Sequence, residues 1–242
     1  MESLSLFILG ILPSLIWLIY FLEKDNDPEP KKMIFLVFVL GVIGAAVAAS
    51  IQAPVRNFLQ TDSVFSGENI SGLIDSFVAI AFLEESVKLL AVLGGVFLFK
   101  VGELDEPVDF MIYMITAGLG FAALENLLYF SMAKEMFPET LTELAFLRFG
   151  ITTLFHAVSA GILGYFLAFS VRKMKKRIIF QGLLVVTFFH ALYNELVELM
   201  TRTESIIYPT LLLSFLLVLT VVLVKAFKQT KRMRGICKPF VK

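Results

Sequence analysis

Apolar residues occur in seven long segments, separated by short stretches that carry most of the charged residues. A helix needs roughly 20 mostly apolar residues to cross the hydrocarbon core of a bilayer, and each segment is about that long. The predicted spans are residues 4–22, 33–53, 73–99, 108–131, 147–171, 178–200 and 206–227. A transmembrane β-barrel would instead have short segments of alternating polarity. The pattern therefore predicts an all-α, polytopic membrane helical bundle with about seven transmembrane helices, forming a single integral-membrane domain over residues 1–242.

The composition agrees with this class. Hydrophobic residues make up 58% of the chain and charged residues 17%, whereas soluble domains have about 45–50% and about 25%. The formal net charge is zero, so no nucleic acid is expected as a partner. The single cysteine, Cys237, excludes an internal disulfide and a cysteine-based zinc cluster. The only tryptophan, Trp17, is expected to be an interfacial anchor.

Lysine and arginine are distributed asymmetrically between alternate loops. One set of loops and the C-terminal tail holds Lys24, Lys31, Lys32, Lys100, Arg172, Lys173, Lys175, Lys176, Arg177 and the basic residues from Lys225 to Lys242. The other set holds Arg56, Lys134, Arg148 and Arg202. The first span lacks the basic start of a cleaved signal peptide. By the positive-inside rule, we expect a multi-pass protein of the cell membrane with its N-terminus outside and its C-terminus in the cytoplasm.

Several spans contain ionisable and amide side chains at membrane depth. These residues are Glu84, Glu85, Lys88, Glu125, Asn126, His156, His190 and Asn194. An ionised group at the centre of a membrane helix costs about 2.5–3.5 kcal/mol, so such groups are tolerated where they face one another or water inside a bundle. At 1.5 Å per residue, the ionisable groups of four spans fall in one layer about 10 Å thick. We infer that they form one site.

Local spacing adds detail to this layer. Glu84 and Lys88 are four residues apart and can pair on one helix face, whereas Glu85 points about 100° away. His190 and Asn194 also share a helix face. Each feature taken singly has a structural explanation, either an ion pair or a helix–helix hydrogen bond. Their joint occurrence in one layer favours a functional site.

Carboxylates, imidazoles and an amide can together activate water. A glutamate in a membrane cavity can accept a proton from water, and a histidine or asparagine can donate to the oxyanion of a tetrahedral intermediate. The same groups can bind zinc, although the HExxH motif of common zinc proteases is absent from the sequence. Proton relays of transporters use the same residue types, so the residues alone leave hydrolysis and proton-coupled transport open.

Three motifs occur in order in separate spans. They are Glu84-Glu85-Ser86-Val87-Lys88 (EExxK), Phe121 to Glu125 (FxxxE) followed by Asn126, and His190 to Asn194 (HxxxN). Together with the short loop Asp27-Pro28-Glu29-Pro30, they resemble the PrsW family of intramembrane proteases, over roughly residues 10–200. That family is related to the CAAX prenyl-protease and bacteriocin-immunity membrane enzymes. The resemblance implies a membrane peptidase that makes the first cut in a membrane-anchored anti-sigma factor.

The chain departs from the related patterns at two positions. The second motif ends in Glu125, where the CAAX enzymes have histidine, and the third ends in Asn194 rather than aspartate. The first departure means that a water-binding Glu–His pair cannot be transferred directly from those enzymes. The second favours an amide donor to the oxyanion and weakens a carboxylate-rich metal site.

These observations predict an intramembrane peptidase in which glutamate and histidine activate water. The expected catalytic residues are Glu84, Glu85, Glu125, His156, His190 and Asn194, supported by Lys88 and Asn126. Glu84 is the expected general base, Glu85 is expected to position water or a histidine, and Lys88 is expected to pair with a glutamate. His190 and Asn194 are expected to stabilise the oxyanion.

The cofactor and the partners are less strongly constrained by the sequence. A zinc ion would be held by His156, His190 and Glu125, but the chain has only two histidines, so metal-free activation is preferred at this point. The expected partners are a single-span membrane protein substrate and the lipid bilayer, and the oligomeric state is not predicted. The alternatives are a proton-coupled transporter or channel, and a non-catalytic scaffold for a transmembrane partner.

Overall fold

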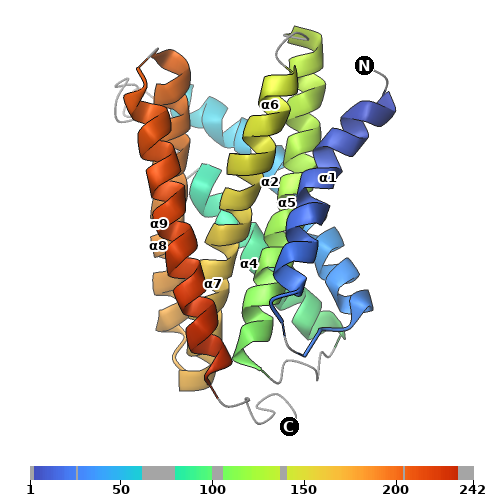
Figure 1. Cartoon of the computed structure of the whole chain (residues 1–242), viewed down its shortest axis with the longest axis vertical. Coiled ribbons are helices and arrows are strands. Elements are labelled where there is room, and N and C mark those ends of the chain that lie inside the picture. The colour runs from blue at the N-terminus through green and yellow to red at the C-terminus, as the bar shows by residue number, and fades with distance from the viewer. Residues whose placement is uncertain are drawn as a thin grey trace.

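The computed structural model of the chain is a helical bundle (Figure 1). It describes residues 3–25, 27–61, 80–99, 106–136, 141–203 and 205–233, and all of their regular structure is helical. The elements are α1 (Ser3–Leu22), α2 (Lys31–Thr61), α4 (Leu83–Phe99), α5 (Pro107–Met136), α6 (Leu141–Leu147), the π-helical turn η3 (Arg148–Thr152), α7 (Thr153–Lys173), α8 (Arg177–Arg202) and α9 (Ile207–Lys231). Six helical stretches within the described residues are long and apolar enough to cross a membrane. The predicted all-α polytopic class is confirmed.

The predicted span 73–99 corresponds to α4. Residues 73–79 lie outside the described residues, and the described helix of 17 residues is shorter than a complete span. Figure 1 shows α4 beginning near the middle of the bundle and running toward its lower end. Residues 80–82 form a π-helical turn that leads into α4, and Glu84 and Glu85 lie in the first turn of α4.

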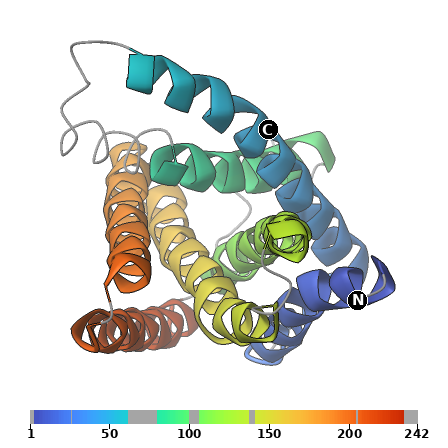
Figure 2. The same ribbon diagram turned by 90° about the horizontal axis from the view of Figure 1, so that it is seen from above.

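Helix α5 is the centre of the fold. Every residue from 107 to 123 is buried, and α1, α2, α4 and α7 surround the helix when the bundle is viewed along its axis (Figure 2). Glycines allow α2 to approach it closely. A Cβ at Gly41 would lie 2.2 Å from the carbonyl oxygen of Ala117, and one at Gly120 would lie 2.1 Å from that of Phe38. Such close packing of small residues is a common way for membrane helices to associate.

The predicted span 147–171 begins earlier than expected and contains a π-helical turn. Helix α6, η3 and α7 form one continuous helical stretch from Leu141 to Lys173. Arg148, which the sequence analysis counted among the few basic residues of one membrane side, is the first residue of η3, and only 6% of its surface is exposed. This arginine belongs to the interior of the bundle. Isolated π-turns are often found at functional sites, because they change which side chains face the core.

The basic loops gather at one end of the bundle. Figure 1 shows that α1, α7 and α9 all end at the bottom, while α2, α5 and α8 begin there. The first connector is fixed at this end by buried carboxylates. Tyr113 donates a hydrogen bond of 2.5 Å to Glu29, which lies beside Asp25 and Asp109. The start of α1 and the end of α9 lie at opposite ends, as an odd number of crossings requires. Which end faces the cytoplasm stays a prediction.

Candidate active site

Polar side chains from several helices line one cavity of about 510 Å³, and four of these helices carry expected catalytic residues. Glu84 comes from α4, Glu125 from α5, His156 from α7, and His190 and Asn194 from α8. These residues are up to 110 positions apart in the sequence, from Glu84 to Asn194. The fold thus brings five of the expected catalytic residues to one place.

A buried carboxylate orients His190. Its Nδ1 atom lies 2.8 Å from Oε1 of Glu85, and the same oxygen accepts bonds from Lys88 at 2.8 Å and from Ser159 at 3.3 Å. Both Glu85 and Lys88 have fully buried side chains. Because a carboxylate paired with lysine can only accept, the proton of a neutral His190 is on Nδ1. Its Nε2 atom then presents a lone pair toward Glu84.

Glu84 and His190 are neighbours in the lining of the cavity. Gln52 of α2 donates a 2.9 Å hydrogen bond to Oε1 of Glu84, which fixes one carboxylate oxygen. The other oxygen lies 3.7 Å from Nε2 of His190, which is too long for a direct hydrogen bond. A water molecule or a cation can bridge a separation of this size.

His156 is held between a carboxylate and a lysine. Nε2 of His156 lies 2.6 Å from Oε2 of Glu125, and its Nδ1 lies 2.9 Å from Nζ of Lys88. Oε2 of Glu125 is buried, yet within the described residues it makes no hydrogen bond of acceptable geometry. Lys88 contacts both Glu85 and His156, so it connects the two histidine environments of the site.

Arg148 completes the surroundings of Glu125. Its guanidinium lies 3.2 Å from Oε1 of Glu125 and donates through Nε to Oδ1 of Asn126 at 2.6 Å. The amide of Asn126 in turn donates to Thr153 at 3.0 Å. Arg148 also lies over the ring of Tyr129, with 4.1 Å between its Cζ atom and the ring centroid. This network anchors η3 to α5 and places a positive charge beside a cavity carboxylate.

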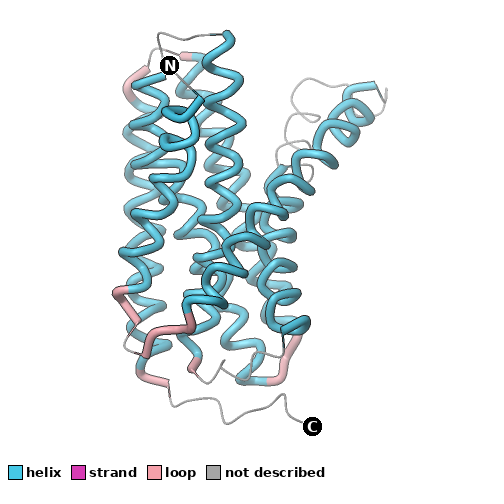
Figure 3. Tube along the Cα trace, turned by 90° about the vertical axis from the view of Figure 1, so that its right-hand side faces the viewer, coloured by secondary structure: helices cyan, strands magenta, loops and turns pink. Residues whose placement is uncertain are grey.

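One side of the cavity is formed by helices that diverge. Ala45 and Ala48 of α2 and Val197 of α8 are among the residues that line the cavity. Helix α2 packs on α4 and α5 rather than on α8, and Figure 3 shows it leaning away from the bundle toward its C-terminal end. Small and apolar residues of α2 and α8 line the cavity together with its polar groups.

The structure corrects one contact expected from the sequence and assigns positions to the supporting residues. The ion pair of Lys88 is with Glu85, three positions away, and not with Glu84. Glu85 and Asn126 are buried behind the cavity rather than in its lining. Their contacts are to His190 and Arg148 respectively, so they orient other side chains.

Comparison of the sequence with known proteins identifies its family. The profile of a family described as PrsW family intramembrane metalloprotease matches residues 29–226. The chain belongs to the PrsW family. It is 30% identical over 221 residues to a Protease PrsW of Oceanobacillus iheyensis, covering 89% of this chain and 94% of that protein. It is 32% identical over 191 residues to a Protease PrsW of Bacillus subtilis, covering 76% and 79%. No solved structure matches the chain significantly.

Membership of the PrsW family confirms the resemblance noted in the sequence and makes the chain a member of a family of intramembrane proteases. The matched region contains all three motifs. It also contains the continuous helix α6–η3–α7, which carries His156 and Arg148.

The family description implies a metal, and the donor set of this PrsW protein fits one. Ligand atoms of Glu84, His156 and His190 lie within 4.8 Å of one another and are all buried. Glutamate oxygen and imidazole nitrogen are zinc ligands. Glu85 behind His190 matches the carboxylate that metal-bound histidines usually have on their other nitrogen. The sequence had named Glu125 in place of Glu84 for this set.

Two contacts around His156 bear on the metal as well. Nε2 of His156 lies 2.6 Å from Oε2 of Glu125, so Glu125 contacts the nitrogen that would bind the metal. Metal binding would change the contact between Lys88 and His156. With Nε2 on a metal, Nδ1 of His156 carries the proton, so Lys88 would keep Glu85 as its partner and release His156.

Sequence reasoning missed several residues of the site, among them Arg148, Gln52 and Ser159, which contact Glu125, Glu84 and Glu85 respectively. A periodic signal for Arg148 was present, because Arg148, Thr152 and His156 follow one another at intervals of four and share a helix face. Gln52 lies near the end of an apolar span, where polar residues are common, so its position did not indicate a site. Ser159 looked like one of the small residues of a packing surface.

Proposed function

We propose that this chain is a metal-dependent intramembrane peptidase that hydrolyses a peptide bond in a single-span membrane protein, with a membrane-anchored anti-sigma factor as the substrate. The observation that carries the proposal is the convergence of Glu84, Glu125, His156 and His190 on one cavity inside an apolar helical bundle. Family membership supports proteolysis, and the motif resemblance supports the substrate class.

Glu84, His156 and His190 would hold the metal, for which zinc is the natural candidate. When bound, it would make a water molecule more acidic and would polarise the scissile carbonyl. This proposal replaces the metal-free alternative preferred from the sequence. It does so because three ligand atoms lie within 4.8 Å of one another and because the family is described as metalloproteases.

Glu125 is the proposed proton carrier. It lines the cavity with 21% of its side chain exposed, whereas Glu85 is completely buried behind it. Glu125 accepts the proton of the attacking water as the hydroxyl adds to the carbonyl carbon. It then delivers that proton to the amide nitrogen as the C–N bond breaks. Arg148, 3.2 Å away, balances its charge before and after the transfer.

Asn194 is the proposed oxyanion donor. It follows His190 by one helical turn, lines the same cavity and is half-buried. An amide N–H can donate to the developing oxyanion without any change of protonation. His190 is oriented by Glu85 for the metal, so the two residues of the third motif have separate roles.

The test is cleavage of a single-span anti-sigma factor by the purified chain in proteoliposomes. Wild type should release a shortened substrate, and Glu125→Gln should lower the rate by at least about 100-fold, which is the range of a lost general base. Glu135→Gln, on the exposed part of the same helix, is the matched control and should keep wild-type activity. Proton flux without cleavage, or substrate binding without cleavage, would contradict the proposal.

A further inference from the structure

A groove between α1 and α9 lies away from the catalytic cavity. Its volume is about 390 Å³, within the range of about 300–1,000 Å³ that is typical of small-molecule sites. Its walls are almost entirely apolar and include Trp17, Phe21, Leu223 and Phe227, with Leu154 of α7 at the back. No residue that lines this groove lines the catalytic cavity.

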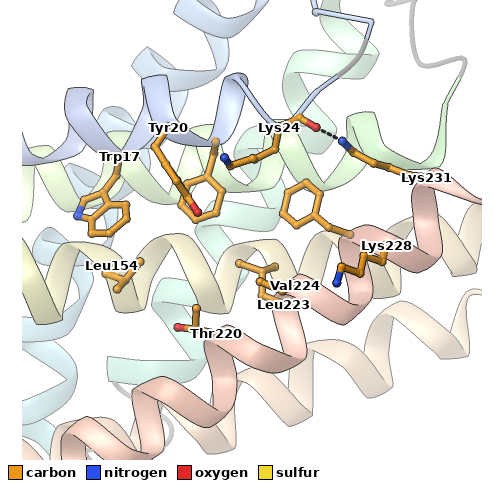
Figure 4. A pocket seen from close by; sticks show the side chains of 11 residues that line it. Trp17, Tyr20, Lys24, Leu154, Thr220, Leu223, Val224, Lys228 and Lys231 are labelled. Atoms are coloured by element: carbon orange, nitrogen blue, oxygen red, sulfur yellow. Dashed lines mark hydrogen bonds between the residues drawn. The ribbon is translucent and has the colours of Figure 1, made fainter.

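Three lysines stand at one end of this groove. Figure 4 shows Trp17 at the left, Lys228 and Lys231 at the right, and Lys24 between them, with its ammonium 4.3 Å from the centre of the Tyr20 ring. Lys231 donates a hydrogen bond to the backbone carbonyl of Lys24, which ties the ends of α1 and α9 together. The groove is therefore positively charged at its lysine end and apolar along its length.

Little negative charge opposes these lysines. Helix α9 contains no acidic residue from Ile207 to Lys231. Among the residues that the structure describes, no carboxylate forms an ion pair with Lys24 or Lys228. Asp25 is nearby in sequence, but it is buried beside Glu29. Glu23 is exposed and does not line the groove.

The length of the groove matches one leaflet. From Thr220 to Lys231 a helix rises by about 16 Å at 1.5 Å per residue. Half of the hydrocarbon core of a bilayer is about 15 Å thick. An acyl chain that enters at the lysine end would therefore reach Trp17 near the middle of the membrane.

We propose that this groove binds one anionic phospholipid, with its headgroup phosphate on Lys24, Lys228 and Lys231 and an acyl chain along Trp17, Leu223 and Phe227. The ligand comes from the leaflet at the end where α1 and α9 terminate. Basic pockets between membrane helices select anionic headgroups through charge, at about five-fold in affinity per lysine. The apolar walls require the acyl chain as well as the phosphate.

Trp17 is in the groove and is the only tryptophan in the chain, so its fluorescence reports occupancy. The sequence predicted an interfacial anchor, but the indole donates a 3.0 Å hydrogen bond to the carbonyl oxygen of Phe149 in η3. The half-buried indole is therefore held in one position on the wall of the groove. A quencher on an acyl chain in the groove would lie beside it.

The test uses the purified chain in phosphatidylcholine vesicles, titrated with phosphatidylglycerol or phosphatidylcholine carrying brominated acyl chains. The brominated anionic lipid should half-quench Trp17 at a mole fraction at least about five-fold lower than the zwitterionic one. Lys228→Ala should reduce this preference by about five-fold, and Lys24→Ala provides a second variant if the first misfolds. Lys225→Ala, which removes a charge of α9 outside the groove, should keep it.

Equal quenching by both headgroups would overturn the proposal, as would a preference that survives both Lys228→Ala and Lys24→Ala. Soluble glycerol phosphate should not relieve the quenching; if it does, the groove recognises phosphate without an acyl chain, and the proposed ligand is wrong. Quenching that falls as the protein density in the vesicle rises would identify a second copy of the chain as the occupant instead.

Discussion

Nδ1 of His190 lies 2.8 Å from Oε1 of Glu85, so a carboxylate that does not line the cavity determines how a cavity histidine is oriented. The same carboxylate accepts from Lys88, which touches the other histidine, His156. The two imidazoles are thus oriented through one buried ion pair. Its removal should affect both stability and the geometry of the site.

Glu85→Gln should destabilise the protein strongly. The substitution leaves Lys88 buried without its counter-charge, and breaking one partner of a buried pair costs about 3–5 kcal/mol. Lys88→Met in the same chain should recover much of this loss, because no uncompensated charge remains. Thermal unfolding of the single and double variants in detergent measures the effect. A double variant that is no more stable than Glu85→Gln would show that the ion pair is not the cause.

Arg148→Met should impair catalysis more than folding. Arg148 lies beside Glu125 and donates to Asn126, so its loss removes the charge that faces the proposed proton carrier. We expect the cleavage rate to fall by about 10-fold to 100-fold. Arg148→Lys should recover part of the rate, since it restores the charge but not the bond to Asn126. An unchanged cleavage rate for Arg148→Met would show that Arg148 has no role in catalysis.

The sequence was sufficient to predict the membrane class and the set of site helices, because long apolar runs and buried charges have a large energetic cost in lipid. It could not predict the pairing within the layer. Glu84 and Glu85 are both within reach of Lys88 along one helix, and the rotation of α4 against α7 and α8 decides between them. Helical spacing alone carries no information on that rotation.

The role of Arg148 also could not be predicted from the sequence, for a different reason. Its position near the predicted end of a span is equally suited to a loop or to a longer helix. Helix α6 extends the membrane helix beyond its predicted start, and Arg148 at the start of η3 lies 3.2 Å from Glu125. A π-turn has no reliable sequence signature, so only the structure could reveal it.

Gly120→Ala should destabilise the bundle, whereas Gly94→Ala should not. A Cβ at Gly120 would meet the backbone oxygen of Phe38 at 2.1 Å, so α2 and α5 would have to separate. A Cβ at Gly94 meets nothing within 4 Å, and alanine is the better helix former by up to about 1 kcal/mol. Thermal unfolding in detergent compares the two. Equal stability of both variants would contradict the close packing of α2 on α5.

The orientation in the membrane can be tested with two cysteines in a Cys237→Ser background. Ile206 and Met174 are exposed, by 77% and 78%, and lie at opposite ends of the bundle. Ile206→Cys should react with an impermeant thiol reagent in intact cells. Met174→Cys should react only after permeabilisation, because the basic loops are expected inside. The reverse pattern would invert the topology.

The most direct test of the proposed metal-dependent peptidase is the zinc content of purified, active protein, measured together with cleavage. Wild type should carry about one zinc per chain, lose it and its activity to a chelator, and regain both when zinc is added. Glu125→Gln should keep the zinc without cleaving, whereas His190→Ala and Glu84→Gln should lose it. Full cleavage by protein that holds no metal would contradict the account.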